Sequence, residues 1–179
     1  MSQPIQCPDS LMPLLCRWSR MTVGLEAEPV ESLPDLGIDL LTAGYGTEEI
    51  MALAVCDLSE HPADLRQAAR RAFASLGVPD EEDREFHLMV AGRSVASRIV
   101  DGTLSPEEGR SLMAAIWTNT HYPKLLSEWI IVEEATYFFR EIMGTPELYT
   151  GLTEATISET IRTLAKEFLS ENQVILHPP

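Results

Sequence analysis

Prolines mark where helices begin along this chain. Six of them follow a residue suited to a cap or loop and precede a stretch with helical rather than alternating hydrophobic spacing: Pro34, Pro62, Pro79, Pro106, Pro123 and Pro146. A helix tolerates proline at its first position because the missing N–H has no intrahelical partner there. The clearest start is Ser105-Pro106-Glu107-Glu108, in which Ser105 can cap the helix and Glu108 can close a capping box. This repeated pattern of prolines at expected helix starts favours an all-α fold.

Hydrophobic spacing between these marks predicts about eight helices. Their expected ranges are 9–21, 34–43, 47–58, 62–76, 80–101, 106–120, 123–143 and 153–171. No pair of strands is expected, because the apolar tail that begins at Val174 ends in two prolines. The 179 residues fit one domain, a compact helical bundle over residues 1–179. In this bundle residues 1–23 can form a separate N-terminal helical appendage, and residues 172–179 form a tail.

The helix expected over 123–143 has apolar residues on nearly its whole circumference. They are Trp129-Ile130-Ile131-Val132 and Tyr137-Phe138-Phe139. A helix that is apolar on all sides is typical of the middle of a bundle. We therefore expect the other helices to surround this one.

Two adjacent carboxylates, Glu133 and Glu134, interrupt this apolar helix. If the helix is central, at least one of them lies in or beside the core, where an isolated charge is costly. One interpretation is a site, either a general acid or base of raised pKa or a ligand for a hard metal ion. The alternative is a solvated strip, or a pairing with an arginine such as Arg140, Arg93 or Arg98.

A metal site would need further ligands, and His87 and His121 are the candidates to join Glu133 and Glu134. The Glu-x-x-His motif of di-iron bundles is absent. His61, three residues before Asp64, is interpreted as a helix cap. The sequence also contains no nucleophile elbow, phosphate-binding loop or H-E-x-x-H motif, so a non-catalytic protein without a cofactor is favoured over an enzyme.

Charge limits the partners of this protein. The sequence has 13 basic and 28 acidic side chains, a net charge of −15. A surface this negative repels phosphate, which argues against nucleic acid and anionic lipid as partners. The run Asp80-Glu81-Glu82-Asp83 at a helix start holds more charge than capping requires. We interpret it as a patch that binds a basic protein, with a solvated helix start as the alternative.

Cysteine usage indicates a reducing compartment. Cys7, Cys16 and Cys56 are odd in number and lack a paired spacing. No uninterrupted apolar run approaches the roughly 18 residues that span a bilayer. A cytoplasmic location is expected.

Residues 44–109 resemble small uncharacterised bacterial helical proteins. The matching elements are Gly44-Tyr45-Gly46-Thr47, Leu76-Gly77, Arg98-Ile99-Val100-Asp101-Gly102 and Ser105-Pro106-Glu107-Glu108-Gly109. The resemblance implies a bacterial, all-helical, cytoplasmic protein, and it carries over no catalytic residue. Some proteins of this kind neighbour toxin systems, so it also implies an immunity-like role.

Three functional hypotheses follow. The first is an acidic helical protein without catalytic activity that binds a basic protein partner, as an inhibitor or immunity protein would. The second is a helical metal-binding protein or enzyme with a buried carboxylate site at Glu133 or Glu134 and a divalent metal as its cofactor. The third is a homodimer formed through the exposed faces of the helices that carry Trp18 and Trp117.

Overall fold

A computed structural model describes residues 3–25, 29–57, 61–119, 126–137, 152–153 and 155–177. Within these residues the chain forms eight α-helices and confirms the all-α class. The helices are α1 (Met12–Thr22), α2 (Leu33–Thr42), α3 (Glu48–Ala54), α4 (Pro62–Ser75), α5 (Arg84–Val100), α6 (Pro106–Asn119), α7 (Ser127–Tyr137) and α8 (Ile157–Glu171). The remaining elements are a short 3-10 helix η1 (Val30–Ser32) and two strands, β1 (Ile5–Gln6) and β2 (Ile175–Leu176).

Helices α2, α3, α4 and α6 start within one residue of the expected positions, whereas α1 and α5 start three and four residues later than expected, at Met12 and Arg84. The backbone N–H of Glu108 donates to Ser105 Oγ at 3.2 Å, and the backbone N–H of Ser105 donates to Glu108 Oε2 at 3.2 Å. This reciprocal pair is the capping box expected at the start of α6. Thr47 caps α3 by accepting from the backbone N–H of Ile50 at 3.3 Å. Both caps satisfy N–H groups that have no carbonyl partner within their own helix.

The expectation of no strand pair is wrong. β1 pairs antiparallel with β2, with Ile5 opposite Leu176, and the N–H of Cys7 donates to the carbonyl of Val174 at 2.9 Å. Val174 and Leu176 are buried and Ile175 between them is exposed, which is the alternation of a half-buried strand. In the sequence, the two final prolines come after Leu176, the last residue of β2.

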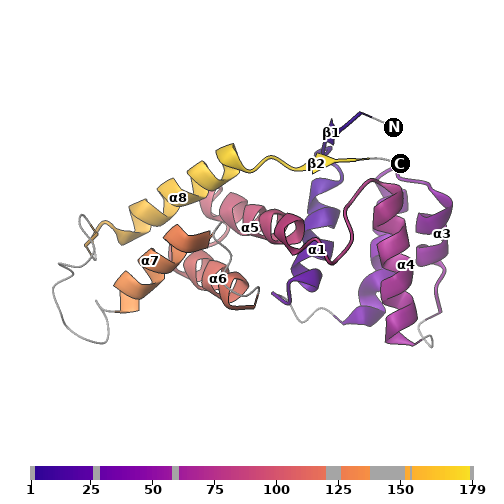
Figure 1. Ribbon diagram of the computed structural model, residues 1–179, viewed down its shortest axis with the longest axis horizontal. Helices are drawn as coiled ribbons and strands as arrows, with labels where there is room; N and C mark the ends of the chain where they lie inside the picture. Colours follow the sequence, from indigo (N-terminus) through magenta and orange to yellow (C-terminus); the bar gives the residue numbers. More distant parts are fainter. Residues whose placement is uncertain are drawn as a thin grey trace.

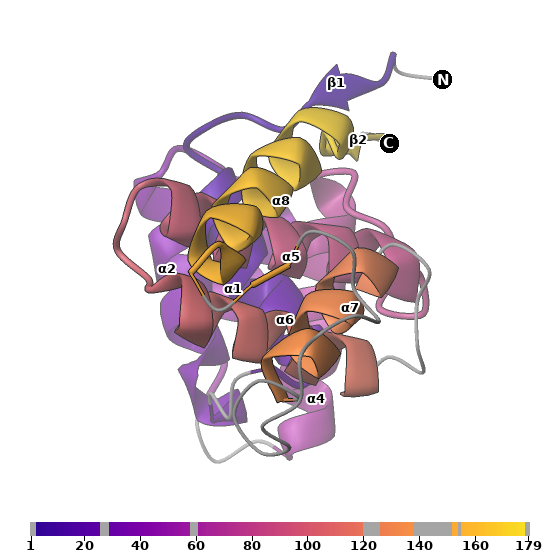
Figure 2. The same ribbon diagram turned by 90° about the vertical axis from the view of Figure 1, so that its left-hand side faces the viewer.

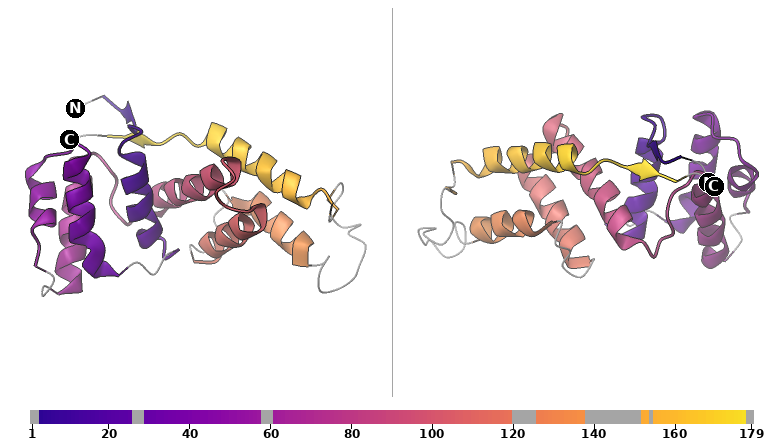
Figure 3. Two further views of the ribbon diagram at one scale, coloured as in Figure 1. Left: turned by 180° about the vertical axis from the view of Figure 1, so that it is seen from behind. Right: turned by 45° about the horizontal axis from the view of Figure 1, so that its top comes forward.

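The helices form two groups joined by α5. Figure 1 shows α1 and α3–α4 at one end of an elongated molecule and α6–α8 at the other, and both views in Figure 3 agree. Figure 2, which looks along the long axis, shows α6, α7 and α8 grouped at the near end. Each group has its own cluster of buried apolar side chains, and α5 contributes Val90 to the first and Val95 to the second.

The central apolar helix expected over 123–143 is not confirmed by its described part. α7 contacts α6 and α8, while Ile131 and Tyr137 on its outer face are 44% and 58% exposed. Helix α5 instead lies between α1, α6 and α8. Its small residues allow this close packing: a Cβ added at Gly92 would lie 2.8 Å from the Phe168 ring. Phe138 and Phe139 lie outside the described residues.

Helix α1, which falls in the range considered as an appendage, packs into the first core cluster. Trp18 is buried and its ring stacks on that of Phe73 in α4, with centroids 5.3 Å apart and planes 9° from parallel. Helix α1 also packs against α5. Residues 12–22 therefore belong to the first group of helices and also contact α5. Among the described residues, no helix combines the length and the apolar character needed to cross a membrane.

Candidate functional site

In the predicted acidic patch, the side chains of Asp80, Glu81 and Asp83 form hydrogen bonds or an ion pair within the protein. Asp83 caps α5 by accepting from the backbone N–H of Phe86 at 3.2 Å, and Asp80 accepts from the backbone N–H of Glu82 at 3.2 Å. Glu81 is partly buried and forms an ion pair with Arg70 of α4. The side chains of Asp80, Glu82 and Asp83 remain exposed. This run therefore shapes the entry into α5 while it keeps a negative surface.

A groove of about 640 Å³ adjoins the start of α5 and is walled by α7 and α8. Figure 1 shows these two helices alongside each other. Among the described residues, the charged side chains that line the groove are four glutamates. The described lining is Glu85, Ser127, Glu128, Trp129, Leu164, Glu167, Phe168, Glu171 and Asn172.

Three helices, α5, α7 and α8, contribute the four glutamates of the groove. On α8, Glu167 and Glu171 are four residues apart and therefore share a face. Glu85 and Glu128 lie in the first turns of α5 and α7, where the helix dipole favours a negative charge. All four side chains are exposed, and among the described residues none of them forms an ion pair. Within the described part of the chain, the groove thus presents negative charge that no ion pair compensates.

The floor of the groove is apolar and belongs to the second core cluster. Trp129 and Phe168 are buried beneath the glutamates, and Leu164 is half-buried beside them. Beyond Asn172 a smaller hollow of about 290 Å³ continues past Glu85 to Asp83. The acidic lining therefore reaches one end of the patch predicted from sequence.

The described structure brings neither Glu133 nor Glu134 into the groove. Glu133 forms an ion pair with Arg110 of α6, whose side chain is only 8% exposed, and Glu134 is exposed. The arginine pairing considered as an alternative is thus present, but the partner is Arg110 rather than Arg93, Arg98 or Arg140. Arg93 instead donates to backbone carbonyl groups at the end of α8. Arg140 lies outside the described residues.

The other predicted metal ligand that the structure describes, His87, faces α1. Its side chain is fully buried, and its Nδ1 lies 3.0 Å from Ser19 Oγ. His121 lies outside the described residues. In the part of the chain that is described, no three His, Cys, Asp or Glu side chains are placed to hold a metal ion. His87 and Glu133 therefore make their contacts with different helices, α1 and α6.

The buried His87 predicts a pH dependence of stability. Burial lowers the pKa of His87, while hydrogen bonding to the backbone of Asp80 and Pro79 and the charges of Glu81 and Asp83 partly oppose this. The unfolded chain therefore binds a proton at a higher pH than the folded protein does. We expect the free energy of unfolding to fall as the pH drops below about 6.5, the ordinary histidine pKa.

Urea unfolding at pH 7.5 and 5.5 measures this effect. In a His87→Gln variant the loss on acidification should be smaller than in the unchanged protein, whereas His177→Gln, at an exposed position, should retain it in full. An equal loss in the unchanged protein and in His87→Gln would contradict the assignment to His87.

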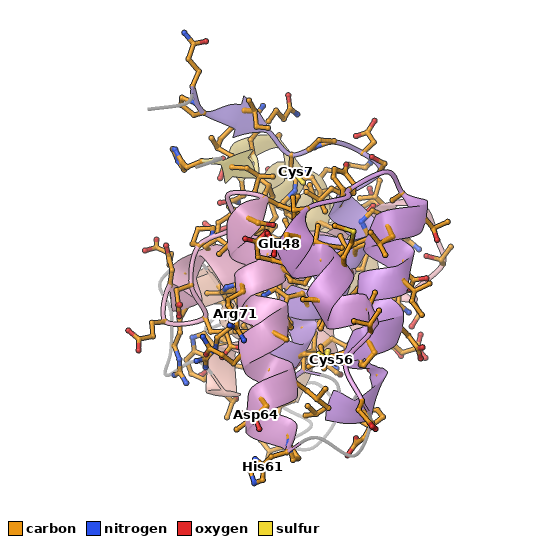
Figure 4. All side chains as sticks on the ribbon, turned by 90° about the vertical axis from the view of Figure 1, so that its right-hand side faces the viewer. Cys7, Glu48, Cys56, His61, Asp64 and Arg71 are labelled. Carbon is orange, nitrogen blue, oxygen red and sulfur yellow. The ribbon has the colours of Figure 1, made fainter. Side chains whose placement is uncertain are left out.

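His61 has the capping role expected from sequence. Its Nδ1 accepts from the backbone N–H of Ala63 at 3.2 Å. Figure 4 shows His61 and Asp64 together at the start of α4, with Arg71 farther along that helix. This position leaves His61 to stabilise the helix start.

No protein-family model matches this chain, and neither a curated protein nor a solved structure does.

Proposed function

We propose that this protein has no catalytic activity and binds a basic segment of another protein in its acidic groove. The observation that carries the proposal is the lining of that groove: four exposed glutamates from three helices, with no lysine or arginine among the lining residues that the structure describes. A net charge of −15 supports the same kind of partner. An inhibitor or immunity protein that covers a basic surface is the concrete form of this function.

The groove suits arginine or lysine side chains. Its volume lies in the range of roughly 300–1,000 Å³ that is typical of binding pockets. The glutamates can pair with the cationic head groups, and the half-buried Leu164 can contact an aliphatic stem. Negative charge over the whole protein would also steer a basic partner toward it and speed association at low salt.

Two observations make the metal-site alternative weaker. The charge of Glu133 is already compensated by Arg110, and Glu134 points to the surface. We also propose a cytoplasmic location, which the three free cysteines support. Nucleic acid and anionic membranes are not proposed as partners, because the net charge opposes them.

Fluorescence anisotropy with a labelled nona-arginine peptide tests the groove. We expect the triple variant Glu128→Gln/Glu167→Gln/Glu171→Gln to weaken binding at least about tenfold, because three surface ion pairs of up to about 1 kcal/mol each are lost. The dependence of Kd on salt should also become shallower, since fewer charges take part.

The matched control is Glu31→Gln/Glu49→Gln/Asp64→Asn, which removes the same number of charges from exposed positions outside the groove. It should change Kd by less than about threefold. Equal weakening in both triple variants would mean that only net charge matters and would overturn the groove as the site. Glu82→Gln tests the predicted patch separately. If this variant loses more affinity for the peptide than the groove variant does, the binding surface is Asp80–Asp83 rather than the groove.

A further inference from the structure

A second hollow, of about 460 Å³, lies between α1, α5 and the C-terminal end of α8. In contrast to the acidic groove, its charged lining is mainly basic: Arg20, Arg93 and Arg98 with one acid, Asp9. The whole chain has 13 basic and 28 acidic side chains. The local sign of charge is therefore opposite to that of the protein as a whole.

One face of α5 supplies most of the polar groups in this hollow. Arg93, Ser94, Ser97 and Arg98 have the spacing i, i+1, i+4 and i+5, which places them along one side of the helix. Two guanidinium groups and two hydroxyl groups thus lie on a single rigid element. Such an element positions side chains more accurately than a loop does.

Contacts within the protein hold Arg20 and Arg93 in place. Arg20 Nη1 donates to Ser94 Oγ at 3.0 Å. Arg93 Nη1 donates to the carbonyl of Leu169 at 2.6 Å and to that of Asn172, at the end of α8. Because these bonds involve only part of the five N–H donors of a guanidinium, Arg93 keeps donors for a ligand. The side chains of Arg20 and Arg93 are therefore pre-organised.

Cys16 lines the same hollow as Arg20 and Arg93, and the charges of both arginines act on its thiol. Burial raises the pKa of this thiol, while a hydrogen bond with Ser94 and the charges of Arg20 and Arg93 lower it. Arg20 of α1 and Arg93 of α5 thus contribute positive charge to the same hollow from two different helices.

We propose that this hollow binds a small molecule that carries a phosphate group. Arginine forks and serine hydroxyls donate to phosphate oxygens in several directions, and Arg93 and Arg98 together match a phosphate dianion better than a carboxylate of single charge. The hollow is larger than phosphate alone needs, so Met12 and Pro13 can cover an organic part. This site is independent of the acidic groove, and each proposal can fail without the other.

Isothermal titration calorimetry with glycerol 3-phosphate tests this site on the full chain, with acetate and chloride at equal ionic strength as the other ligands. We expect saturable one-to-one binding of glycerol 3-phosphate and no comparable binding of acetate or chloride. Arg98→Gln should weaken the binding about tenfold, because a charge-assisted hydrogen bond is lost.

Two further variants separate a built site from general attraction. Arg162→Gln makes the same charge change at a 45% exposed position on α8 and should alter Kd by less than twofold. Ser97→Ala removes a hydroxyl without changing charge and should weaken binding severalfold. The proposal is overturned by an absence of saturable binding, by equal binding of acetate, or by equal effects of Arg98→Gln and Arg162→Gln.

Discussion

Gly37→Ala should lower the free energy of unfolding by about 3 kcal/mol, although alanine is intrinsically better than glycine inside a helix by about 1 kcal/mol. Gly37 lies in α2 where that helix meets α3. An added Cβ would be 2.7 Å from the backbone N of Ala54, 2.9 Å from its Cα and 3.0 Å from Leu53 Cγ. Backbone atoms cannot rotate aside as a side chain can. The two helices would have to separate, and the core between them would lose contact.

Gly46→Ala is the matched control, because the added Cβ at Gly46 meets no heavy atom within 4 Å. Its φ lies outside the left-handed region, so alanine fits the backbone there as well. We expect a change within about 0.5 kcal/mol for this variant. Urea unfolding followed by circular dichroism measures both. Equal stability of the two variants would contradict the close approach of α2 and α3.

The starts of α3 and α6 could be predicted because the interactions that form them are local. The Ser105–Glu108 box and the Thr47 cap each join residues three apart in sequence. The pairing of Ile5 with Leu176 joins opposite ends of the chain, so no short sequence window contains it. A two-residue strand also gives almost no alternation to detect. Local interactions such as helix caps can therefore be predicted from a short stretch of sequence, whereas the long-range pairing of β1 with β2 cannot.

The central position of α5 could not be predicted from apolar content alone. The large apolar side chains of residues 123–143 predict that this segment is the central helix. In the structure, however, Ile131 and Tyr137 of this segment are exposed. What allows α5 to pack on several sides is its small residues, including Ala91, Gly92 and Ala96, all of which are buried. Small side chains contribute little to a hydrophobic pattern but permit close helix packing.

The acidic groove shows the same limit for functional sites. The acidic residues Asp80–Asp83 are consecutive, so the sequence alone reveals them, and Asp83 borders the hollow next to the groove. Glu128 and Glu167 are far from these residues in sequence, and only the packing of α7 and α8 against the start of α5 brings them near Glu85. Part of the groove does leave a pattern in the sequence: on α8, the four-residue spacing of Glu167 and Glu171 places both carboxylates on one face beside the apolar stripe.

Trp18→Ala should lower the free energy of unfolding by about 4 kcal/mol, in the range of large-to-small changes at buried aromatic residues. Trp18 is 1% exposed and stacks on Phe73, so its loss leaves a cavity between α1 and α4. Trp18→Phe keeps a ring for the stacking and should cost less than half as much. Urea unfolding of both variants also tests the role of residues 1–23. If this segment were an appendage, Trp18→Ala would leave the main unfolding transition unchanged, whereas packing against both α4 and α5 requires the whole transition to shift.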